Sequence, residues 1–253
     1  MQVSIIIATY NAGKVLQSCL DSIIPQLNAD VELLIIDGLS KDNTMSIIKN
    51  NSRYISYYIS EKDNGVYDAW NKGINSAKGE WIMFIGADDI LLPHSIEKYL
   101  HFITENEVSE IDYISAKNEF VDNKGELLKI MGGASDWNKM KKYMISAHVA
   151  SLHSKKNLFD KVGLYNTTEF KICSDYELLL RKQDNLKYLF FDELIARMQA
   201  GGMSFTLKAI VETYKIRKFH HSIGFLENQI LFIRDFLGFK FFVWRKKLVG
   251  GKF

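Results

Sequence analysis

The first third of the chain alternates apolar runs with segments of helical spacing. Residues 3–8, 31–36 and 81–85 are apolar almost throughout, which is typical of parallel strands buried on both faces. Residues 54–59 predict one further strand. The segments between these strands repeat apolar residues every three or four positions, as amphipathic helices do. This rhythm predicts a doubly wound α/β domain whose central sheet is mostly parallel and flanked by helices.

The rest of the chain mixes both element types. The helix over residues 66–77 is expected to end at Gly79, because glycine takes the left-handed cap conformation without steric cost. A turn at 122–125 separates two short strand patterns and predicts a hairpin. The other predicted elements are helices at 93–104, 155–161 and 174–182, a strand at 111–116, and mostly helix over 207–236. Residues 188–191 and 194–198 predict either a strand pair or one strand with an extension.

Polar residues follow three of the predicted strands at the point where each strand ends. They are Thr9, Tyr10 and Asn11 after the first strand, Asp37 after the second, and Asp88 and Asp89 after the fourth. In doubly wound sheets, ligands bind beyond the carboxyl ends of the strands. We therefore expect these side chains to meet along one edge of the sheet and to form a binding site.

Composition narrows the class of protein. With 253 residues and 47% hydrophobic content, the chain can form one domain with an appendage. A formal net charge of +2 gives no field suited to nucleic acid. Cys19 and Cys173 are too few for a zinc motif or a disulfide framework, which suits a reducing cytosol. We expect no signal peptide and no membrane-spanning run of roughly 20 apolar residues.

The last stretch, residues 236–253, places aromatic residues beside cations. The cations are Lys240, Arg245, Lys246, Lys247 and Lys252. Such a segment either packs as a helix on the domain or lies in a membrane surface with its cations near anionic headgroups. The pattern favours the membrane surface.

Five stretches together resemble the inverting family-2 glycosyltransferases of the GT-A fold, in particular bacterial enzymes that assemble O-antigen, capsule and other surface polysaccharides, including those of lipopolysaccharide. The stretches are SIIIATYN (4–11), IIDGLSKDNT (35–44), DNGVYDAWNKGINSAKGEW (63–81), FIGADD (84–89) and SDYELLLR (174–181). The resemblance implies a GT-A domain over residues 1–204 and a helical extension over 205–253. Within that domain it implies a nucleotide-binding half at 1–92 and an acceptor half at 93–204.

The resemblance also implies roles for residues that line a nucleotide-sugar pocket. Tyr10 would stack on the base, and Asp37 would bond to the base. The other residues implied to line the pocket are Thr9, Asn11, Asp68, Asn71, Lys72 and Ala87. The alternative for Asp37 and Ser40 is a turn and helix cap, a common use of these residue types.

Asp88 matches the metal-binding aspartate of the family's Asp-x-Asp signature. Through it the resemblance implies Mg²⁺ or Mn²⁺, which would neutralise the charge that builds up on the leaving diphosphate. Gly86 stands where the first aspartate of the signature is expected. Asp89 either compensates as a second metal ligand or caps the turn before Pro93.

Asp175 falls where the family places its catalytic carboxylate, and it is the candidate general base. The alternative is structural: Ser174 and Glu177 match a capping box, with Asp175 in the first turn of a helix. His148 matches an acceptor-side histidine of such enzymes, although a histidine within an apolar run is more often a core residue.

The resemblance thus implies a cytoplasmic, membrane-peripheral enzyme that transfers a hexose from a nucleotide sugar, most simply a UDP-hexose. The expected acceptor is a sugar linked to polyprenyl diphosphate, and direct displacement would invert the anomeric centre. Two alternatives stay open, a nucleotidyltransferase and a non-catalytic protein that binds nucleotide sugars. The first usually carries a Gly-rich phosphate loop near the N-terminus, and Asn11-Ala12-Gly13-Lys14 does not resemble one. The second is motivated by Gly86.

Overall fold

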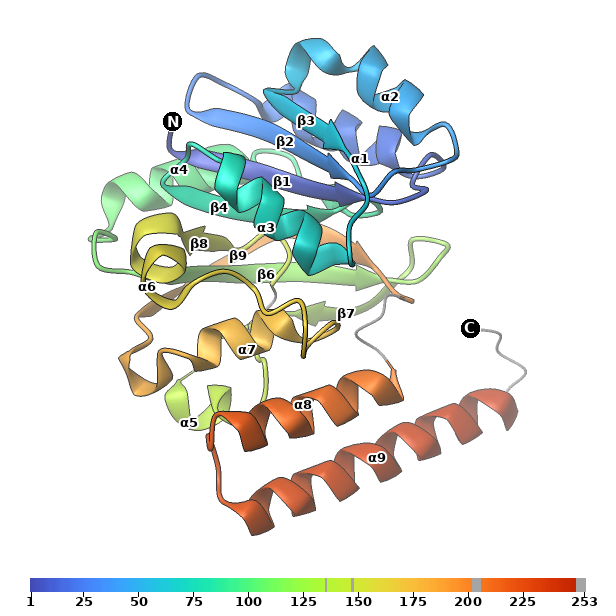
Figure 1. Cartoon of the computed structure of the whole chain (residues 1–253), viewed down its shortest axis with the longest axis vertical. Coiled ribbons are helices and arrows are strands. Elements are labelled where there is room, and N and C mark those ends of the chain that lie inside the picture. The colour runs from blue at the N-terminus through green and yellow to red at the C-terminus, as the bar shows by residue number, and fades with distance from the viewer. Residues whose placement is uncertain (135, 147, 202–205, 249–253) are drawn as a thin grey trace.

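A computed structural model describes residues 1–134, 136–146, 148–201 and 206–248, without the side chains of 246–248. A mixed sheet forms the centre, and helices flank both of its faces (Figure 1). Within the described residues, its nine strands run in the order β3-β2-β1-β4-β8-β6-β9-β5, and β7 pairs with β6. The α/β fold expected from the sequence is confirmed.

The N-terminal half of the sheet is parallel throughout. It consists of β1 (Val3–Thr9), β2 (Val31–Asp37), β3 (Tyr57–Ser60) and β4 (Trp81–Gly86). The pairing register aligns Thr9 with Asp37, Asp37 with Ser60, and Ala8 with Gly86. These strands therefore end in step, and the loops that follow them share one edge of the sheet.

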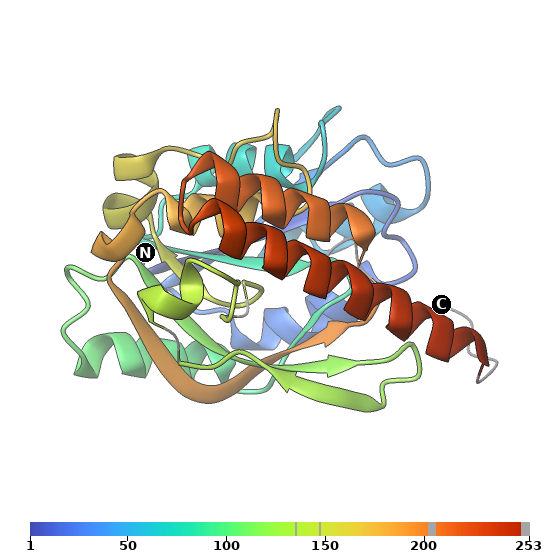
Figure 2. The ribbon, with the colours of Figure 1, turned by 90° about the horizontal axis from the view of Figure 1, so that it is seen from below.

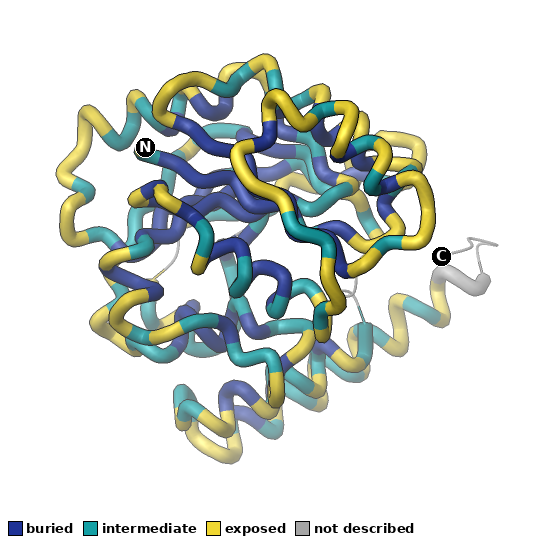
Figure 3. Tube along the Cα trace, turned by 45° about the horizontal axis from the view of Figure 1, so that its top comes forward, coloured by how far each residue is buried: buried dark blue, intermediate teal, exposed yellow. Residues whose placement is uncertain are grey.

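Alternate residues of these strands supply two separate cores. Ile5, Leu33 and Met83 face the helices α1 (Leu16–Ile23), α2 (Thr44–Asn50) and α4 (Ser95–Glu105). Ile6, Leu34 and Phe84 face α3 (Val66–Ser76) and α7 (Ser174–Leu180). Because both faces are covered, the strands must be apolar at every position, which explains the unbroken apolar runs. Figure 3 shows these strands as a buried centre below exposed loops.

The second half of the sheet brings in antiparallel strands. β8 (Leu152–Ser154) pairs antiparallel with β4 and with β6 (Tyr113–Val121), and β7 (Leu127–Met131) forms the predicted hairpin with β6. β9 (Tyr188–Gln199) is parallel to β6 and antiparallel to β5 (Ile90–Leu91). The short helices are η1 (Ile24–Gln26), η2 (Ser52–Tyr54), α5 (Trp137–Met140), η3 (Lys155–Phe159), α6 (Asp160–Val162) and η4 (Gln183–Asn185).

The role predicted for Gly79 is wrong. Helix α3 is capped by Ala77 in an extended conformation, and Gly79 is not among the residues with positive φ. Gly79 instead lies against β1, where an added Cβ would approach the backbone nitrogen of Ser4 to 2.6 Å. Glycine is thus required here for the close approach of two backbone segments.

The C-terminal region forms an antiparallel hairpin of two helices, α8 (Leu207–Phe219) and α9 (Phe225–Leu248), across one side of the molecule (Figure 2). The side chain of Gln229 donates to the Tyr214 hydroxyl at 2.8 Å, and Tyr214 also contacts the ring of Phe232. In the part of the chain that the structure describes, neither this pair nor any other helix has the length and apolarity needed to cross a bilayer.

Candidate functional site

Asp37 is the centre of the polar row at the carboxyl edge of the sheet. Its buried carboxylate accepts hydrogen bonds from the hydroxyls of Thr9 (2.9 Å) and Ser60 (2.6 Å) and from both the backbone and the hydroxyl of Ser40. These four bonds match the roughly four acceptor positions of a carboxylate. Asp37 therefore fixes the ends of β1, β2 and β3 relative to one another. A nucleotide base that bonds to the Asp37 carboxylate must replace one of these four hydrogen bonds.

Of the turn and helix cap given as the alternative for Asp37 and Ser40, the structure shows the turn and not the cap. Helix α2 begins after Asn43, without a side-chain cap bond. Ser40 instead closes the turn after β2 and accepts from the backbone N–H of Asn11 at 2.8 Å. Asn11, at φ 49°, in turn accepts from the backbone of Lys41. The two loops thereby hold each other, and Tyr10, which precedes Asn11 in the first loop, has 68% of its surface exposed.

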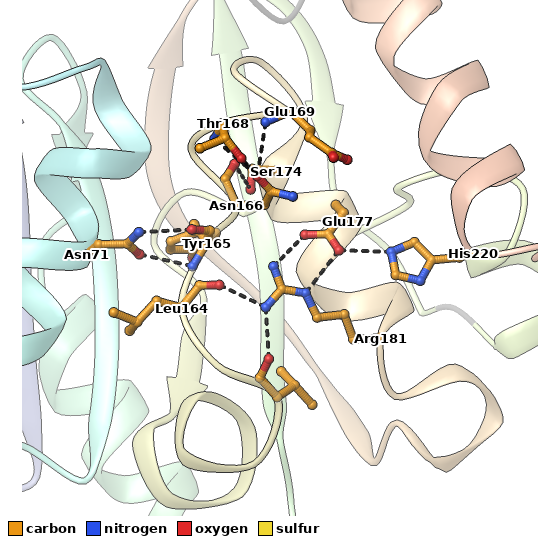
Figure 4. Close-up of polar contacts among 11 residues, drawn as sticks. Asn71, Leu164, Tyr165, Asn166, Thr168, Glu169, Ser174, Glu177, Arg181 and His220 are labelled. Carbon is orange, nitrogen blue, oxygen red and sulfur yellow. Dashed lines mark hydrogen bonds and ion pairs between the residues drawn. The ribbon is translucent and has the colours of Figure 1, made fainter.

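Helix α3 contributes a second wall beside these loops. The carboxylate of Asp68 accepts from the backbone of Asn64 (2.9 Å), and the Lys72 ammonium lies 2.8 Å from Glu61. Asn71 has a different role, because both ends of its amide bond to the backbone of Tyr165 at 2.9 Å (Figure 4). Asn71 thus holds the loop between α6 and α7.

The turn after β4 separates the two adjacent carboxylates. Asp88 is exposed, whereas Asp89 is 5% exposed and accepts from the backbone N–H of Gly86 at 3.0 Å. Burial and the neighbouring charge of Asp88 raise the pKa of Asp89 to about 7. An added Cβ at Gly86 would lie 2.6 Å from the Asp89 carboxylate, so that carboxylate occupies the space beside position 86. The local role of Asp89 is to close this turn.

The side chains present fit a divalent cation only if a bound phosphate-bearing molecule supplies further oxygen atoms to it. In the described part of the chain, no three His, Cys, Asp or Glu side chains group closely enough to hold a metal. Asp88 is the accessible carboxylate of the turn. Hard cations prefer oxygen ligands and are often held by one or two carboxylates together with phosphate.

Asp175 lies in the first turn of α7, but the predicted capping box is wrong. The residue that caps α7 is Cys173, and its side chain makes no cap bond. Ser174 donates to the carbonyl of Asn166, and Glu177 bonds to other partners. The Asp175 carboxylate accepts from the Tyr67 hydroxyl at 2.9 Å. Burial raises the pKa of Asp175, and this hydrogen bond opposes the rise.

Three charged residues hold α7 in place. Arg181 donates to the carbonyls of Val162 and Leu164 at 2.8 Å, and Glu177 joins Arg181 to His220, the residue that caps the C-terminal end of α8 (Figure 4). From α8, Glu212 accepts the backbone N–H groups of residues 171–173 at 2.8–2.9 Å. Tyr67, Arg181 and Glu212 were not predicted as individual site residues, although Tyr67 and Arg181 stand inside the motifs that resemble the family.

His148 lies in the core. It is 7% exposed, its ring is stacked on Phe84, and it contacts the Tyr165 hydroxyl (2.9 Å) and His153 (3.2 Å). Burial lowers the pKa of His148 to about 3. This is the arrangement of a satisfied core histidine, the alternative that its apolar neighbours in the sequence favour, and we assign it no acceptor-side role.

Comparison with known proteins identifies the family. The model of Glycosyl transferase family 2 matches residues 4–164. A PGL/p-HBAD biosynthesis glycosyltransferase of Mycobacterium bovis is 32% identical over 214 residues, which cover 81% of this chain and 79% of that protein. An uncharacterized glycosyltransferase of Rickettsia typhi is 28% identical over 70% of this chain and 57% of its own length.

Two solved structures share the fold. S. aureus TarS 1–349, in complex with UDP-GlcNAc, superposes with a TM-score of 0.70 at 17% identity, over 95% of this chain and 73% of that chain. A mannosyltransferase of Pyrobaculum calidifontis, in complex with GDP-Man and Mn²⁺, gives a TM-score of 0.61 at 14% identity, over 88% and 65%. The fold is thus GT-A-like, and the chain belongs to glycosyl transferase family 2.

Proposed function

We propose that this glycosyltransferase moves a hexose from a UDP-sugar to a saccharide linked to a polyprenyl-diphosphate lipid, with inversion, in bacterial surface polysaccharide synthesis. The observation that supports the proposal is the placement of the polar side chains that end the parallel strands relative to the carboxylate of Asp175. The ends of β1, β2 and β4 form one polar row. Asp175 accepts a hydrogen bond from Tyr67 of α3, the helix beside this row.

The donor would lie along the polar row. The exposed ring of Tyr10 offers a stacking surface for the base, beside Thr9 and Asp37. Asp68, Lys72 and Ala87 border the same edge, and the cation of Lys72 suits a phosphate-bearing ligand. Solved proteins of this fold bind UDP-GlcNAc and GDP-Man, which supports a nucleotide diphosphate sugar as the donor class.

Asp88 would hold Mg²⁺ or Mn²⁺ against the diphosphate, and Asp89 would support the turn that presents it. The cation neutralises the charge that the leaving diphosphate gains. Asp175 would accept the proton of the acceptor hydroxyl while that oxygen attacks the anomeric carbon opposite the diphosphate. A positioned base of this kind contributes about 10²–10⁴-fold to the rate.

Transfer can be tested with a synthetic lipid-diphosphate sugar as acceptor. UDP release and product would be measured with UDP-glucose, UDP-galactose and UDP-N-acetylhexosamines, with and without Mn²⁺. Asp175→Asn should lower kcat by about 10²–10⁴-fold and leave UDP affinity within twofold, since its carboxylate acts only on the acceptor proton. Asp88→Asn should weaken Mn²⁺-dependent UDP binding.

Two results would overturn these assignments. Full activity in Asp175→Asn would remove Asp175 as the base. UDP binding without turnover on any acceptor would favour the alternative of a nucleotide-sugar-binding protein.

We further propose that α9 places the enzyme on the inner face of the cytoplasmic membrane. One side of α9 carries apolar side chains at intervals of three or four residues, each at least 55% exposed. They are Leu226, Ile230, Ile233, Leu237, Phe241 and Trp244. The exposed cations Lys240 and Arg245 lie within the same stretch. An apolar helix face bordered by cations suits a surface with anionic headgroups.

Sedimentation with vesicles tests this surface. Wild-type protein should bind vesicles that contain phosphatidylglycerol and bind pure phosphatidylcholine weakly. Leu226→Ser with Leu237→Ser should reduce binding at least tenfold, because each lost leucine removes an apolar anchor. The matched control replaces Leu127 and Leu128, which are similarly exposed on β7. Equal binding by both double variants would overturn the proposal, and vesicle-independent self-association through α9 would favour a second copy of the chain as the partner.

A further inference from the structure

The hydroxyl of Tyr67 lies between two hydrogen-bond acceptors. Its oxygen is 2.9 Å from the Asp175 carboxylate and 2.8 Å from the backbone carbonyl oxygen of Ile172. Tyr67 is 6% exposed, and its ring packs against Trp70 and Tyr165. The ring is therefore held in place, and the orientation of the O–H bond is what can still change.

A tyrosine hydroxyl has one hydrogen, so it can donate to only one of these acceptors at a time. When Asp175 is ionised, the charged carboxylate is the stronger acceptor. When Asp175 is protonated, its own O–H can donate to the Tyr67 oxygen, and the Tyr67 hydrogen is then free to bond to the Ile172 carbonyl. All three oxygens are then joined by two hydrogens.

We propose that Tyr67 is a positioning residue that sets the charge of Asp175 before sugar transfer and reorients its hydroxyl when Asp175 takes the proton. The assignment of Asp175 as the base rests on the proposed function. Before transfer, Tyr67 donates to the Asp175 carboxylate and keeps it ionised and oriented despite its burial. During transfer, the acceptor's O–H bond breaks and an O–H bond forms on Asp175.

The Tyr67 hydrogen then turns to the carbonyl of Ile172, and no proton leaves the tyrosine. The proton count balances, because Asp175 gains the one proton that the acceptor hydroxyl loses. The carbonyl of Ile172 matters because it accepts the Tyr67 hydrogen once the bond from Tyr67 to Asp175 is lost. Tyr67 therefore favours the ionised base, and the carbonyl of Ile172 reduces the cost of proton capture by giving the Tyr67 hydrogen a second acceptor.

The test uses NMR on the free full-length protein and needs no acceptor. The Asp175 side-chain carboxyl, labelled with ¹³C and assigned by its loss in Asp175→Asn, is titrated beside the labelled backbone carbonyl of Ile172. In the wild type, both signals should move with one midpoint. In Tyr67→Phe, the Asp175 midpoint should rise by about one pH unit or more, since a hydrogen bond to a charged group is strong. The Ile172 signal should no longer follow it.

Two further proteins keep the test decisive. Tyr176→Phe is the matched control, because Tyr176 follows Asp175 directly and its buried hydroxyl has no hydrogen-bond partner within the described residues. Its Asp175 midpoint should equal that of the wild type. 3-Fluorotyrosine at position 67 keeps the hydroxyl and makes it a more acidic donor. It should therefore lower the midpoint of the Asp175 titration.

An Asp175 midpoint that is unchanged or lower in Tyr67→Phe would overturn the proposal, as would an Ile172 carbonyl that does not titrate in the wild type. Enzyme assays separate this outcome from a failure of the proposed function. If Asp175→Asn transfers sugar at the wild-type rate, Asp175 is not the base. The hydrogen-bond coupling, read by NMR, still stands or falls on its own.

Discussion

Gly86 shows how one missing side chain reshapes the carboxylate turn. Because position 86 has no Cβ, the Asp89 carboxylate can fold back over it and accept its N–H at 3.0 Å. Asp89 is thereby buried, and Asp88 is left as the accessible carboxylate. The second carboxylate of this turn thus supports the loop.

Replacement of Gly86 by alanine should displace Asp89. The new Cβ would lie 2.6 Å from the Asp89 carboxylate and 3.0 Å from that of Asp88, so the turn must shift. We expect a loss of about 1–3 kcal/mol in the free energy of unfolding and weaker Mn²⁺-dependent UDP binding. Calorimetry of unfolding and UDP titration would measure both. Gly133→Ala is the control, because an added Cβ there meets nothing within 4 Å; equal behaviour of the two variants would contradict the prediction.

Residues whose role follows from position along a strand were predictable from the sequence. Thr9 and Asp37 end neighbouring parallel strands, so their meeting follows from the topology alone. Tyr67 and Glu212 were not, because their partners lie 108 residues away in Asp175 and 39–41 residues away in residues 171–173. Which turn of a helix meets which loop depends on packing, and no local pattern records it.

At the scale of elements, α8 serves as a support for α7. The carboxylate of Glu212 accepts hydrogen bonds from the three backbone N–H groups that precede α7. His220, which caps α8, contacts Glu177 of α7 at 2.8 Å. The seven-residue helix α7 has no side-chain cap of its own. Helices this short are marginal by themselves, so α7 depends on such tertiary contacts.

Glu212→Gln should loosen the start of α7. One amide oxygen cannot replace a charged carboxylate for three donors, and we expect about 1–3 kcal/mol lower stability, which corresponds to about 2–4 °C in Tm per kcal/mol. Because Asp175 follows this segment, kcat should fall more than the donor KM rises. Differential scanning calorimetry and transfer kinetics would measure these effects. Exposed Glu107→Gln should leave both unchanged, and a Glu212 variant of wild-type stability would contradict the role.

Element types were predictable where periodicity was strong, and element boundaries less so. The strand expected at 111–116 begins at Tyr113 and continues through residues 120–121 of the predicted hairpin as the single strand β6. Of the two alternatives for 188–198, a strand pair or one strand with an extension, the structure shows the single strand β9. The helical period over 207–236 hid a break between α8 and α9 at residues 220–224. Pairing with neighbouring strands extends β6 and β9 through positions of weak local preference.

For the whole molecule, buried histidines make stability depend on pH. Burial lowers the pKa of His148 to about 3 and that of His153 well below its usual value, so both are neutral in the folded chain. Below the unfolded value of about 6.5, the unfolded chain binds protons that the folded chain does not. The histidine contribution to stability is therefore full above pH 6.5 and falls as the pH drops towards 3.

His148→Gln should reduce this acid sensitivity. At pH 5 the histidine should cost about 2 kcal/mol relative to pH 7.5, since each unit between 6.5 and the pH costs about 1.36 kcal/mol. Urea unfolding at both pH values would measure the change. Asp89, whose pKa is raised to about 7, makes the free energy of unfolding change with pH in the opposite direction. The quantity compared is therefore the difference in unfolding free energy between variant and wild type at each pH. Exposed His101→Gln is the control, and equal slopes for wild type and His148→Gln would refute the prediction.

The sheet order also sets when the carboxylate turn can be completed during synthesis. Leu91, which follows Asp88 and Asp89, pairs with Ala196 of β9. About 100 residues separate the two partners, which a ribosome adds at about 5–20 residues per second. For roughly 5–20 s, β5 therefore has no β9 to pair with in the nascent chain. Because β5 has only two residues and an acidic turn precedes it, this edge offers little surface for wrong pairing while β9 is still being made.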